Sequence, residues 1–278
     1  MSKADTETAR RTASGSSFYW AMRLLPPEKR EAMYAIYRFC RAVDDIADEA
    51  TAPDSSRTTE LQAWRDAIAA LYRGESSGNV GFLQPPVQHF ALRERDFLSV
   101  IDGMEMDASG TMIAPDVATL GRYCDCVASA VGRLSIKVFG MEEEPGFALA
   151  HHLGRALQLT NILRDLDEDA ELGRLYLPRE LLEGAAVPFE SPSRAIAHPR
   201  IDPVCRGVAE MAKQHYRDSE IILESNPRGD LRPPRLMRAV YSAMLSRMQQ
   251  RGWSAPRERT RIPKPVLIGL VLRFGLLA

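Results

Sequence analysis

The sequence predicts an all-α protein built as a single domain. Apolar residues recur three and four positions apart along most of the chain, which is the spacing that gives a helix one buried face. Runs that alternate β-branched and polar residues, the signal of a half-buried strand, are almost absent from the sequence. The hydrophobic fraction of 45% suffices for a large core, and 278 residues allow one large domain.

The predicted helices follow one another with short breaks. The first opens at Pro26-Pro27-Glu28 and runs to about Glu49, with Met33, Ile36 and Phe39 on its apolar face. The others are expected at about 60–73, 85–107, 116–139, 144–170, 202–225 and 232–250. The breaks are rich in Pro, Gly and Ser, and they are too short to mark a domain boundary. We therefore predict one domain over residues 17–278, preceded by a polar, disordered segment at 1–16.

The composition excludes several classes of protein. The 36 basic and 37 acidic side chains give a net charge of −1, which excludes a nucleic-acid binder that depends on a strong basic field. A polar start and only four cysteines favour reduced thiols and a cytoplasmic location. The apolar run Val266–Leu272 is far shorter than the ~20 residues of a membrane-spanning helix.

The C-terminal tail combines basic and apolar side chains. Pro265–Ala278 holds Leu, Ile, Val and Phe, with Lys264 before it and Arg273 within it. A segment of this kind is able to lie on a bilayer surface, which predicts a peripheral contact with the inner face of the cell membrane. Packing of the same segment on the protein core is the alternative.

The first segment with chemical content lies in the first long helix. At about 100° per residue, Tyr37, Arg41, Asp44 and Asp48 fall on one face. The two carboxylates, four residues apart, repel each other unless a cation lies between them. A solvated face is the simpler interpretation of such a pair considered alone.

A second polar face favours a site instead. Gln158, Asn161, Asp165 and Asp169 share one face of the predicted 144–170 helix, and each is a hydrogen-bonding group or an oxygen ligand. Apolar residues cover the flanking directions, so these groups are expected inside the protein, where polar groups need partners. Two such faces predict a site for hard divalent ions, with Mg²⁺ as the expected ion and Mn²⁺ as an alternative.

Other metal sites fit the sequence less well. The D-x-D-x-D run that begins at Asp165 resembles the start of an EF-hand loop, but its sixth position is alanine and its twelfth is tyrosine. A di-iron bundle would require two Glu-x-x-His repeats, which the sequence lacks. His151 and His152 point about 100° apart on a helix, so we interpret them as structural rather than as a ligand pair.

Arginines accompany both acidic faces. Arg41 lies on the first face, and Arg164 and Arg174 flank the second. Carboxylates alone repel phosphate, but Mg²⁺ that bridges carboxylates to a diphosphate, with arginines on the remaining oxygens, makes the combination coherent. Because the surrounding helix surface is apolar, the sequence predicts a diphosphate on a long hydrocarbon as the substrate.

Two long motifs resemble the squalene/phytoene synthase family. The segment Gly154–Asp169, followed by Arg174–Pro178, resembles one family signature throughout, and Tyr123–Gly132 resembles the other. The segment Ser17–Pro26 and the first pair of aspartates also fit. The similarity spans about residues 15–275, and the Gly154–Asp169 motif is its most specific part.

The resemblance implies a fold, a reaction and a set of site residues. The fold is the isoprenoid (terpenoid) synthase fold, a helical bundle around a central apolar cavity, and the reaction is a head-to-head (1'-1) condensation of two allylic diphosphates. Carried over by position, the ligands of Mg²⁺ and diphosphate, which are also the catalytic carboxylates, are Asp44, Asp48, Asp165 and Asp169, joined by Asn161. The residues implied to contact the diphosphate and prenyl groups are Ser17, Phe18, Tyr37, Arg41, Gln158, Arg164, Arg174 and Tyr241. Tyr123 and Tyr176 are implied to steer cation or proton chemistry, while packing at a helix interface is the alternative for Tyr123 and Tyr241.

Within the family, the resemblance is greatest to the bacterial branch that makes presqualene diphosphate for hopanoids. It rests on residues 18–22, 161–170 and 251–264. It implies that two farnesyl diphosphates react: one ionises, its allylic cation attacks the double bond of the second, and loss of a proton closes a cyclopropane. No NADPH is expected for a reaction that stops there, and downstream enzymes of the hopanoid pathway are candidate partners.

Two alternatives stay open from the sequence. One is a phytoene or dehydrosqualene synthase of carotenoid biosynthesis. The other, from a different class, is a non-catalytic helical assembly factor. The retention of all four aspartates on two aligned faces argues against the second alternative.

Overall fold

The computed structural model describes residues 17–49, 54–75, 78–110 and 112–276. The predicted disordered segment at 1–16 lies outside these ranges. Within them the chain is built from helices, and β structure is limited to one isolated bridge between Ile113 and Leu175. The all-α prediction is confirmed.

The helices vary from one turn to more than six turns in length. Their bounds are α2 Ser17–Arg23, α3 Pro27–Ala47, α4 Asp54–Tyr72, α5 Gln84–Phe90, α6 Glu94–Ala108, α7 Val117–Cys124, α8 Ala130–Phe139, α9 Glu143–Arg164, α10 Leu166–Glu171, α11 Arg179–Gly184, α12 Pro192–Ile196, α13 Ile201–Glu224, α14 Arg232–Arg251 and α15 Lys264–Leu276, with a 3₁₀ segment at Gly78–Leu83 and a π-helical turn at Asp125–Ser129.

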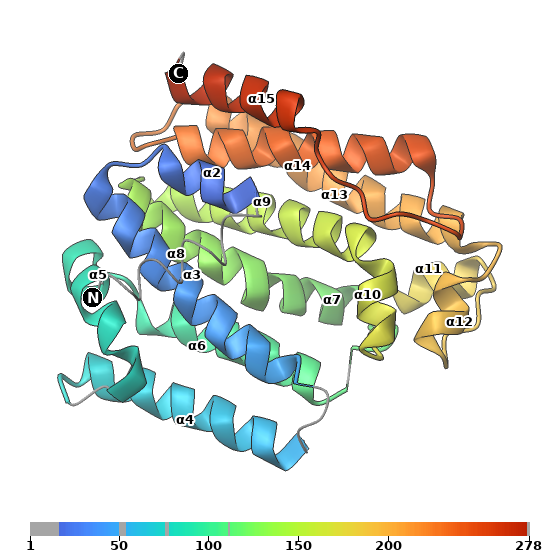
Figure 1. Ribbon diagram of the computed structural model, residues 1–278, viewed down its shortest axis with the longest axis horizontal. Coiled ribbons are helices and arrows are strands. Elements are labelled where there is room, and N and C mark those ends of the chain that lie inside the picture. Colours follow the sequence, from blue (N-terminus) through green and yellow to red (C-terminus); the bar gives the residue numbers. More distant parts are fainter. Residues whose placement is uncertain (1–16, 50–53, 76–77, 111, 277–278) are drawn as a thin grey trace.

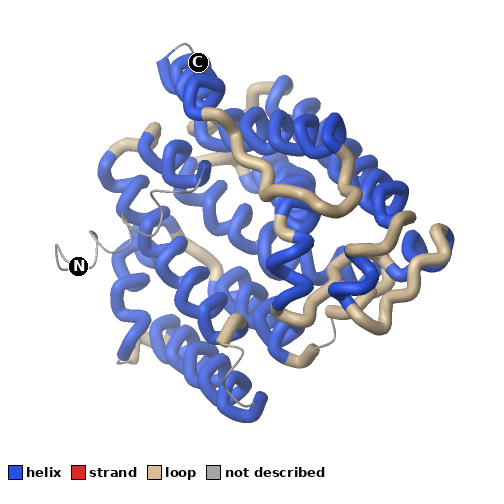
Figure 2. Tube along the Cα trace, turned by 45° about the vertical axis from the view of Figure 1, so that its right-hand side comes forward, coloured by secondary structure: helices blue, strands red, loops and turns tan. Residues whose placement is uncertain are grey.

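The long helices stack in layers around α9. Helix α9 packs on α8 and the π-helical turn on one side and on α13 and α14 on the other. Helices α3 and α6 lie beyond α8, and α4 covers α6 on the outside (Figure 1). The short helices α10, α11 and α12 gather at one end of the bundle, and α15 lies along α14 at the surface (Figures 1 and 2).

Most of the predicted helices are present, with three corrections inside them. The predicted 85–107 helix is broken at Ala91, which adopts a left-handed φ of 49° and ends α5. The predicted 116–139 helix contains the π-helical turn at Asp125–Ser129. The predicted 144–170 helix ends at Arg164, and α10 begins after Asp165.

A contact from a distant segment accompanies the break after α9. The indole Nε1 of Trp253 donates a hydrogen bond of 3.0 Å to the carbonyl oxygen of Leu163. In a continuous helix that carbonyl would accept from the amide four residues later; where the chain bends at Asp165, the indole supplies a donor to it. The bend separates Asp165 from the regular part of α9 but keeps it beside Asp169, whose amide donates to the Asp165 carbonyl oxygen at 2.8 Å.

Several helices lie in segments that the sequence analysis treated as breaks or left without structure. These helices are α2, α11, α12 and α15. The first three have at most seven residues, which is too short for a clear helical period, and proline opens α12. The four cysteines carry free thiols, as the composition predicted.

Candidate active site

A cavity of about 1280 Å³ runs through the bundle between α3, α9 and α14. Its volume exceeds the ~300–1,000 Å³ of most small-molecule pockets. One part of the wall is almost entirely apolar, and its residues include Met33, Ile36, Val100, Val127, Leu153, Leu157 and Met237. The cavity therefore offers room for more than one long hydrocarbon chain, with polar side chains gathered in one region of its wall.

The first predicted acidic face lies in that polar region. Asp44 and Asp48 on α3 both line the cavity, and Tyr37 and Arg41 line it on the same helix. Arg41 Nη1 donates to Asp44 Oδ2 at 2.5 Å. Arg174 Nη1 donates to Asp48 Oδ1 at 2.6 Å, so an arginine from the segment after α10 reaches the end of α3.

The second predicted face meets the same cavity. Gln158 and Asn161 on α9, Asp165 at the bend and Asp169 on α10 all line it. Arg164 Nε donates to Asp165 Oδ1 at 2.7 Å. The buried Oδ1 atom of Asn161 has no hydrogen-bond partner among the described residues, although its amide nitrogen donates to Gln158 at 3.4 Å.

The electrostatics of the polar region show an excess of negative charge. Burial, and next the charge of Asp48, raise the pKa of Asp44 to about 6. Burial, and next the charge of Asp165, raise the pKa of Asp169 to about 8. The arginines lower both pKa values but do not restore them to the ordinary range. A region that holds carboxylates of raised pKa and an orphaned amide oxygen fits a divalent cation with oxygen ligands.

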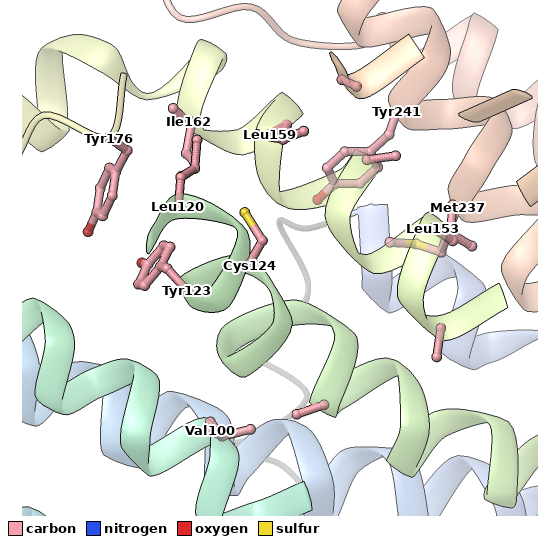
Figure 3. Packing of buried hydrophobic residues seen from close by; sticks show 14 of the residues in the cluster. Val100, Leu120, Tyr123, Cys124, Leu153, Leu159, Ile162, Tyr176, Met237 and Tyr241 are labelled. Atoms are coloured by element: carbon pink, nitrogen blue, oxygen red, sulfur yellow. The ribbon is translucent and has the colours of Figure 1, made fainter. Parts of the chain in front are cut away.

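The two predicted tyrosines lie together next to an aspartate that the sequence analysis missed. The rings of Tyr123 and Tyr176 are stacked with centroids 5.0 Å apart (Figure 3). Tyr123 Oη donates to Asp107 Oδ2 at 2.9 Å, and Tyr176 Oη donates to Asp107 Oδ1 at 2.7 Å. Asp107 lines the cavity from α6, and burial raises its pKa to about 6.

A signal for Asp107 exists in the sequence. Phe97, Val100, Ile101 and Met104 form the buried stripe of α6, and Asp107 continues the same three- and four-residue spacing. A carboxylate on an apolar helix stripe is buried, and buried carboxylates are paired or functional. The spacing of residues in the sequence therefore indicates a buried carboxylate at Asp107.

The tail after α14 supplies a further arginine to the site. Arg259 contacts Asp165 at 2.9 Å and Glu168 at 3.1 Å, and it lines the cavity. The neighbouring Arg257 contacts Asp167 at 2.9 Å and is itself buried. Residues 251–264 carry part of the family resemblance, but their distance along the chain from residues 165–169 hides this contact from the sequence.

The remaining predicted residues have different outcomes. Tyr241 of α14, labelled in Figure 3, lines the cavity. It also interacts with Arg164. Ser17 and Phe18 open α2, and their side chains lie outside the described part of the structure. The structure thus brings the described members of the predicted set to one cavity, while their individual roles stay predictions.

Comparisons with known proteins agree with this architecture. The family model for squalene/phytoene synthase matches residues 11–265. A presqualene diphosphate synthase from Zymomonas mobilis is 54% identical over 271 residues, which cover 98% of this chain and 93% of that protein. A presqualene diphosphate synthase from Sinorhizobium fredii is 49% identical over 268 residues, which cover 96% of both.

A solved structure supports the fold independently. A dehydrosqualene synthase in complex with ligand matches with a TM-score of 0.83 over 98% of this chain and 95% of that chain. Its sequence identity is 23%, so this likeness concerns the fold, which is the predicted all-α isoprenoid synthase fold. The family match over nearly the whole chain and the two full-length relatives lead to one conclusion: this protein belongs to the squalene/phytoene synthase family.

Proposed function

We propose that this protein is a prenyltransferase that condenses two farnesyl diphosphates head-to-head into presqualene diphosphate and releases one diphosphate. The observation that carries the proposal is the cavity of about 1280 Å³, apolar over most of its wall and lined with carboxylates and arginines in one region. The names of the two relatives that are 54% and 49% identical support the choice of product.

The polar region of the cavity is suited to Mg²⁺, with Mn²⁺ as an alternative. The residues that would hold it are Asp44, Asp48, Asn161, Asp165 and Asp169, whose oxygens are the ligands that hard divalent ions prefer. Bound there, the ion would neutralise the charge of the departing diphosphate. The raised pKa values of Asp44 and Asp169 and the unpaired Oδ1 of Asn161 support this assignment.

Arginine side chains would take the remaining diphosphate oxygens. Arg41, Arg164, Arg174 and Arg259 surround the polar region, and each now pairs with one of its carboxylates. When a cation satisfies those carboxylates, the guanidinium groups are released to bind the diphosphate with their forked geometry. Ionisation of the substrate is then assisted by positive charge at the leaving oxygen.

Asp107 with its two tyrosines is placed to influence the later steps. The hydroxyl groups of Tyr123 and Tyr176 both donate to the Asp107 carboxylate, which holds the two rings against the cavity. We propose that the two tyrosine rings stabilise the allylic cation through their π faces. The proton that leaves when the cyclopropane closes would reach Asp107, whose pKa of about 6 suits proton acceptance near neutral pH.

The product is tested by mass spectrometry of purified protein with Mg²⁺ and either farnesyl or geranylgeranyl diphosphate. We expect farnesyl diphosphate to accumulate as presqualene diphosphate, seen before and after phosphatase treatment, and added NADPH to give little squalene. A C40 hydrocarbon from the longer substrate would establish a phytoene synthase instead, and dehydrosqualene or squalene would identify the other products of the family. No turnover of either substrate in the presence of Mg²⁺ would favour the non-catalytic assembly factor.

We propose a cytoplasmic protein that touches the inner face of the membrane through α15. Among the described residues, no helix is both long and apolar enough to cross a bilayer. One face of α15 packs on the core with Leu267, Leu270, Val271 and Phe274, while Val266 and Leu272, outside that face, are 43% and 50% exposed. The exposed Lys264 and Arg273 complement an anionic lipid surface. Contact with the membrane would also deliver a lipid product to downstream hopanoid-pathway enzymes.

A further inference from the structure

A cluster of three side chains that could ligate a metal ion lies between α9 and α13, away from the cavity. It consists of His152 on α9 and of His215 and Asp218 on α13. The two helices lie side by side in the bundle (Figure 1). His152 is nine residues before Asn161, which places it on the opposite side of α9 from the polar region of the cavity. None of the three residues lines the cavity.

The three side chains converge on one point. The Nδ1 atoms of His152 and His215 are 3.1 Å apart, and His152 Nδ1 is 3.4 Å from Asp218 Oδ2. One ligand atom from each residue lies within 4.8 Å of the other two. In a tetrahedral site with metal–nitrogen bonds of ~2.0–2.1 Å, neighbouring ligand atoms are about 3.3 Å apart. Two edges of such a site are thus already formed by side chains of separate helices.

The ligand types indicate a transition metal ion rather than Mg²⁺. Imidazole nitrogens suit Zn²⁺, Cu²⁺, Ni²⁺ and Co²⁺, whereas Mg²⁺ prefers oxygen ligands. Three protein ligands with 28% of the His152 side chain and 31% of the Asp218 side chain exposed leave a fourth position open to water. Burial, and next the neighbouring His152, lower the pKa of His215 to about 4, so its imidazole is neutral, as a metal ligand must be.

We propose that His152, His215 and Asp218 form a Zn²⁺ site that joins α9 to α13. The proposal revises the interpretation of His151 and His152 as purely structural, because the ligand partners of His152 come from α13 and not from its neighbour. It is independent of the proposed function, since it involves none of the cavity residues. The alternative is a hydrogen bond between the two imidazoles, in which one Nδ1 carries a hydrogen and the other accepts it.

The charges around the proposed Zn²⁺ site do not exclude a cation, because carboxylates oppose the nearby arginine. Arg155, one turn further along α9, places a positive charge near His215. The carboxylate of Asp218 opposes that charge within the cluster, and Asp125 lies 3.9 Å from the adjacent His151.

The experiment uses the full chain, purified without a histidine tag, in excess Mg²⁺ that fills sites made of oxygen ligands. Co²⁺ is titrated while its visible d–d absorption is followed, and Zn²⁺ is then added as a competitor. We expect one tetrahedral Co²⁺ per chain, displaced by Zn²⁺, and a rise in the melting temperature with Zn²⁺. His152→Gln, His215→Gln and Asp218→Asn should each weaken binding about 10-fold or more, since even residues that only orient a ligand cost 10–100-fold. His151→Gln, one residue away from a ligand, is the matched control and should bind like the unaltered chain.

Two results would overturn the site. One is the absence of a stoichiometric Co²⁺ spectrum in the unaltered chain, which would leave only the hydrogen-bonded pair. The other is Co²⁺ binding that survives in both histidine variants. Circular dichroism verifies that the variants fold, and Asp218→Asn, at a half-exposed position, separates loss of a ligand from loss of structure.

Discussion

At the scale of single residues, the carboxylates in the polar region of the cavity are held at a cost that a bound cation would relieve. Asp44 and Asp169 line the same cavity, and burial together with a neighbouring aspartate raises the pKa of each. The ionised forms of these carboxylates are therefore unfavourable in the metal-free protein and would become favourable next to a bound cation. A site that must bind a diphosphate with the help of metal ions is expected to show this pattern.

Substitution of these aspartates tests their role in activity. We expect Asp44→Asn and Asp169→Asn to lower turnover by about 100-fold or more, because each removes a charge that holds the metal without changing the shape of the side chain. Product formation from farnesyl diphosphate measures the loss, and circular dichroism should stay unchanged. Unimpaired turnover in either variant, or full activity in excess chelator, would place the site elsewhere.

The raised pKa of Asp169 also predicts how stability depends on pH. The ordinary pKa of an aspartate is 3.8, and burial raises that of Asp169 to about 8, so the folded chain binds more protons than the unfolded chain between these pH values. The free energy of unfolding contributed by this group therefore falls as pH rises through that interval. In metal-free buffer, Asp169→Asn should melt above the unaltered protein at about pH 8.5, and the difference should shrink toward about pH 5.

The same experiment has a control and a second readout. Asp66→Asn, on the outer helix α4, changes an exposed aspartate away from the cavity and is the control. Addition of Mg²⁺ should raise the melting temperature of the unaltered protein and have little effect on Asp169→Asn. If the difference in melting temperature between Asp169→Asn and the unaltered protein stayed constant across the pH range, the ionised form of Asp169 would not be destabilised by its surroundings.

At the scale of helices, the polar face of α9 depends on how closely α9 approaches its neighbours. A Cβ atom added at Gly154 would lie 2.9 Å from the backbone nitrogen of Ser129 in the π-helical turn. A Cβ atom added at Gly132 of α8 would lie 3.0 Å from the Cβ atom and 3.1 Å from the Cα atom of Ala150 in α9. The two glycines allow backbone contact between α9 and the α8 layer, and this contact sets the position of Gln158, one turn after Gly154.

Gly154→Ala tests this contact. We expect a loss of about 1–3 kcal/mol in the free energy of unfolding, because backbone atoms cannot move aside as a flexible side chain would. Alanine favours a helix over glycine by about 1 kcal/mol, and this gain offsets part of the loss. Urea unfolding measures the change. Gly184→Ala, where a Cβ atom would meet nothing within 4 Å, is the control and should be neutral or stabilising. Equal stability of the two variants would contradict the close contact.

The helices also show what a sequence can and cannot predict. Helix α13 and helix α14 were predicted within about one residue, because their apolar spacing is long and regular. The bend at Asp165 was not, and the indole that donates to the Leu163 carbonyl there comes from Trp253, which is distant along the chain. The aspartates of the site were found from their spacing on one face, whereas Arg259 reaches Asp165 only through the folded tail. Local periodicity is written in the sequence, and contacts between distant segments are not.

At the scale of the whole molecule, charge and apolar surface are separated along the tail after α14. Arg257 and Arg259 bind the acidic segment 165–168, while α15 continues along α14 and covers part of the cavity with Leu267 and Ile268. The same helix turns Val266 and Leu272 outward. One short tail therefore connects the polar region of the site, the cavity wall and the surface that we propose meets the membrane.

Flotation with liposomes tests the outer face of α15. The double variant Val266→Gln/Leu272→Gln removes exposed apolar area and leaves the packed face, with Leu270 and Phe274, intact. We expect binding to vesicles of phosphatidylethanolamine and phosphatidylglycerol to fall about 10-fold or more, because each side chain contributes ~1.5–3 kcal/mol when fully buried in an apolar phase. High salt should weaken binding of the unaltered chain, since it would screen the attraction between the exposed Lys264 and Arg273 and an anionic lipid surface.

The flotation experiment separates a membrane contact from simple packing of the tail. Ile221→Gln on α13 is the control, because 66% of Ile221 is exposed on a helix far along the chain from α15, and it should float like the unaltered protein. A chain that ends at Pro263 should lose binding as well, but it also loses three residues of the cavity wall, Lys264, Leu267 and Ile268, so its turnover changes with its partitioning. The double variant keeps that wall and isolates the surface. Equal partitioning of the double variant and the unaltered chain would leave α15 as a helix whose function is to close the cavity.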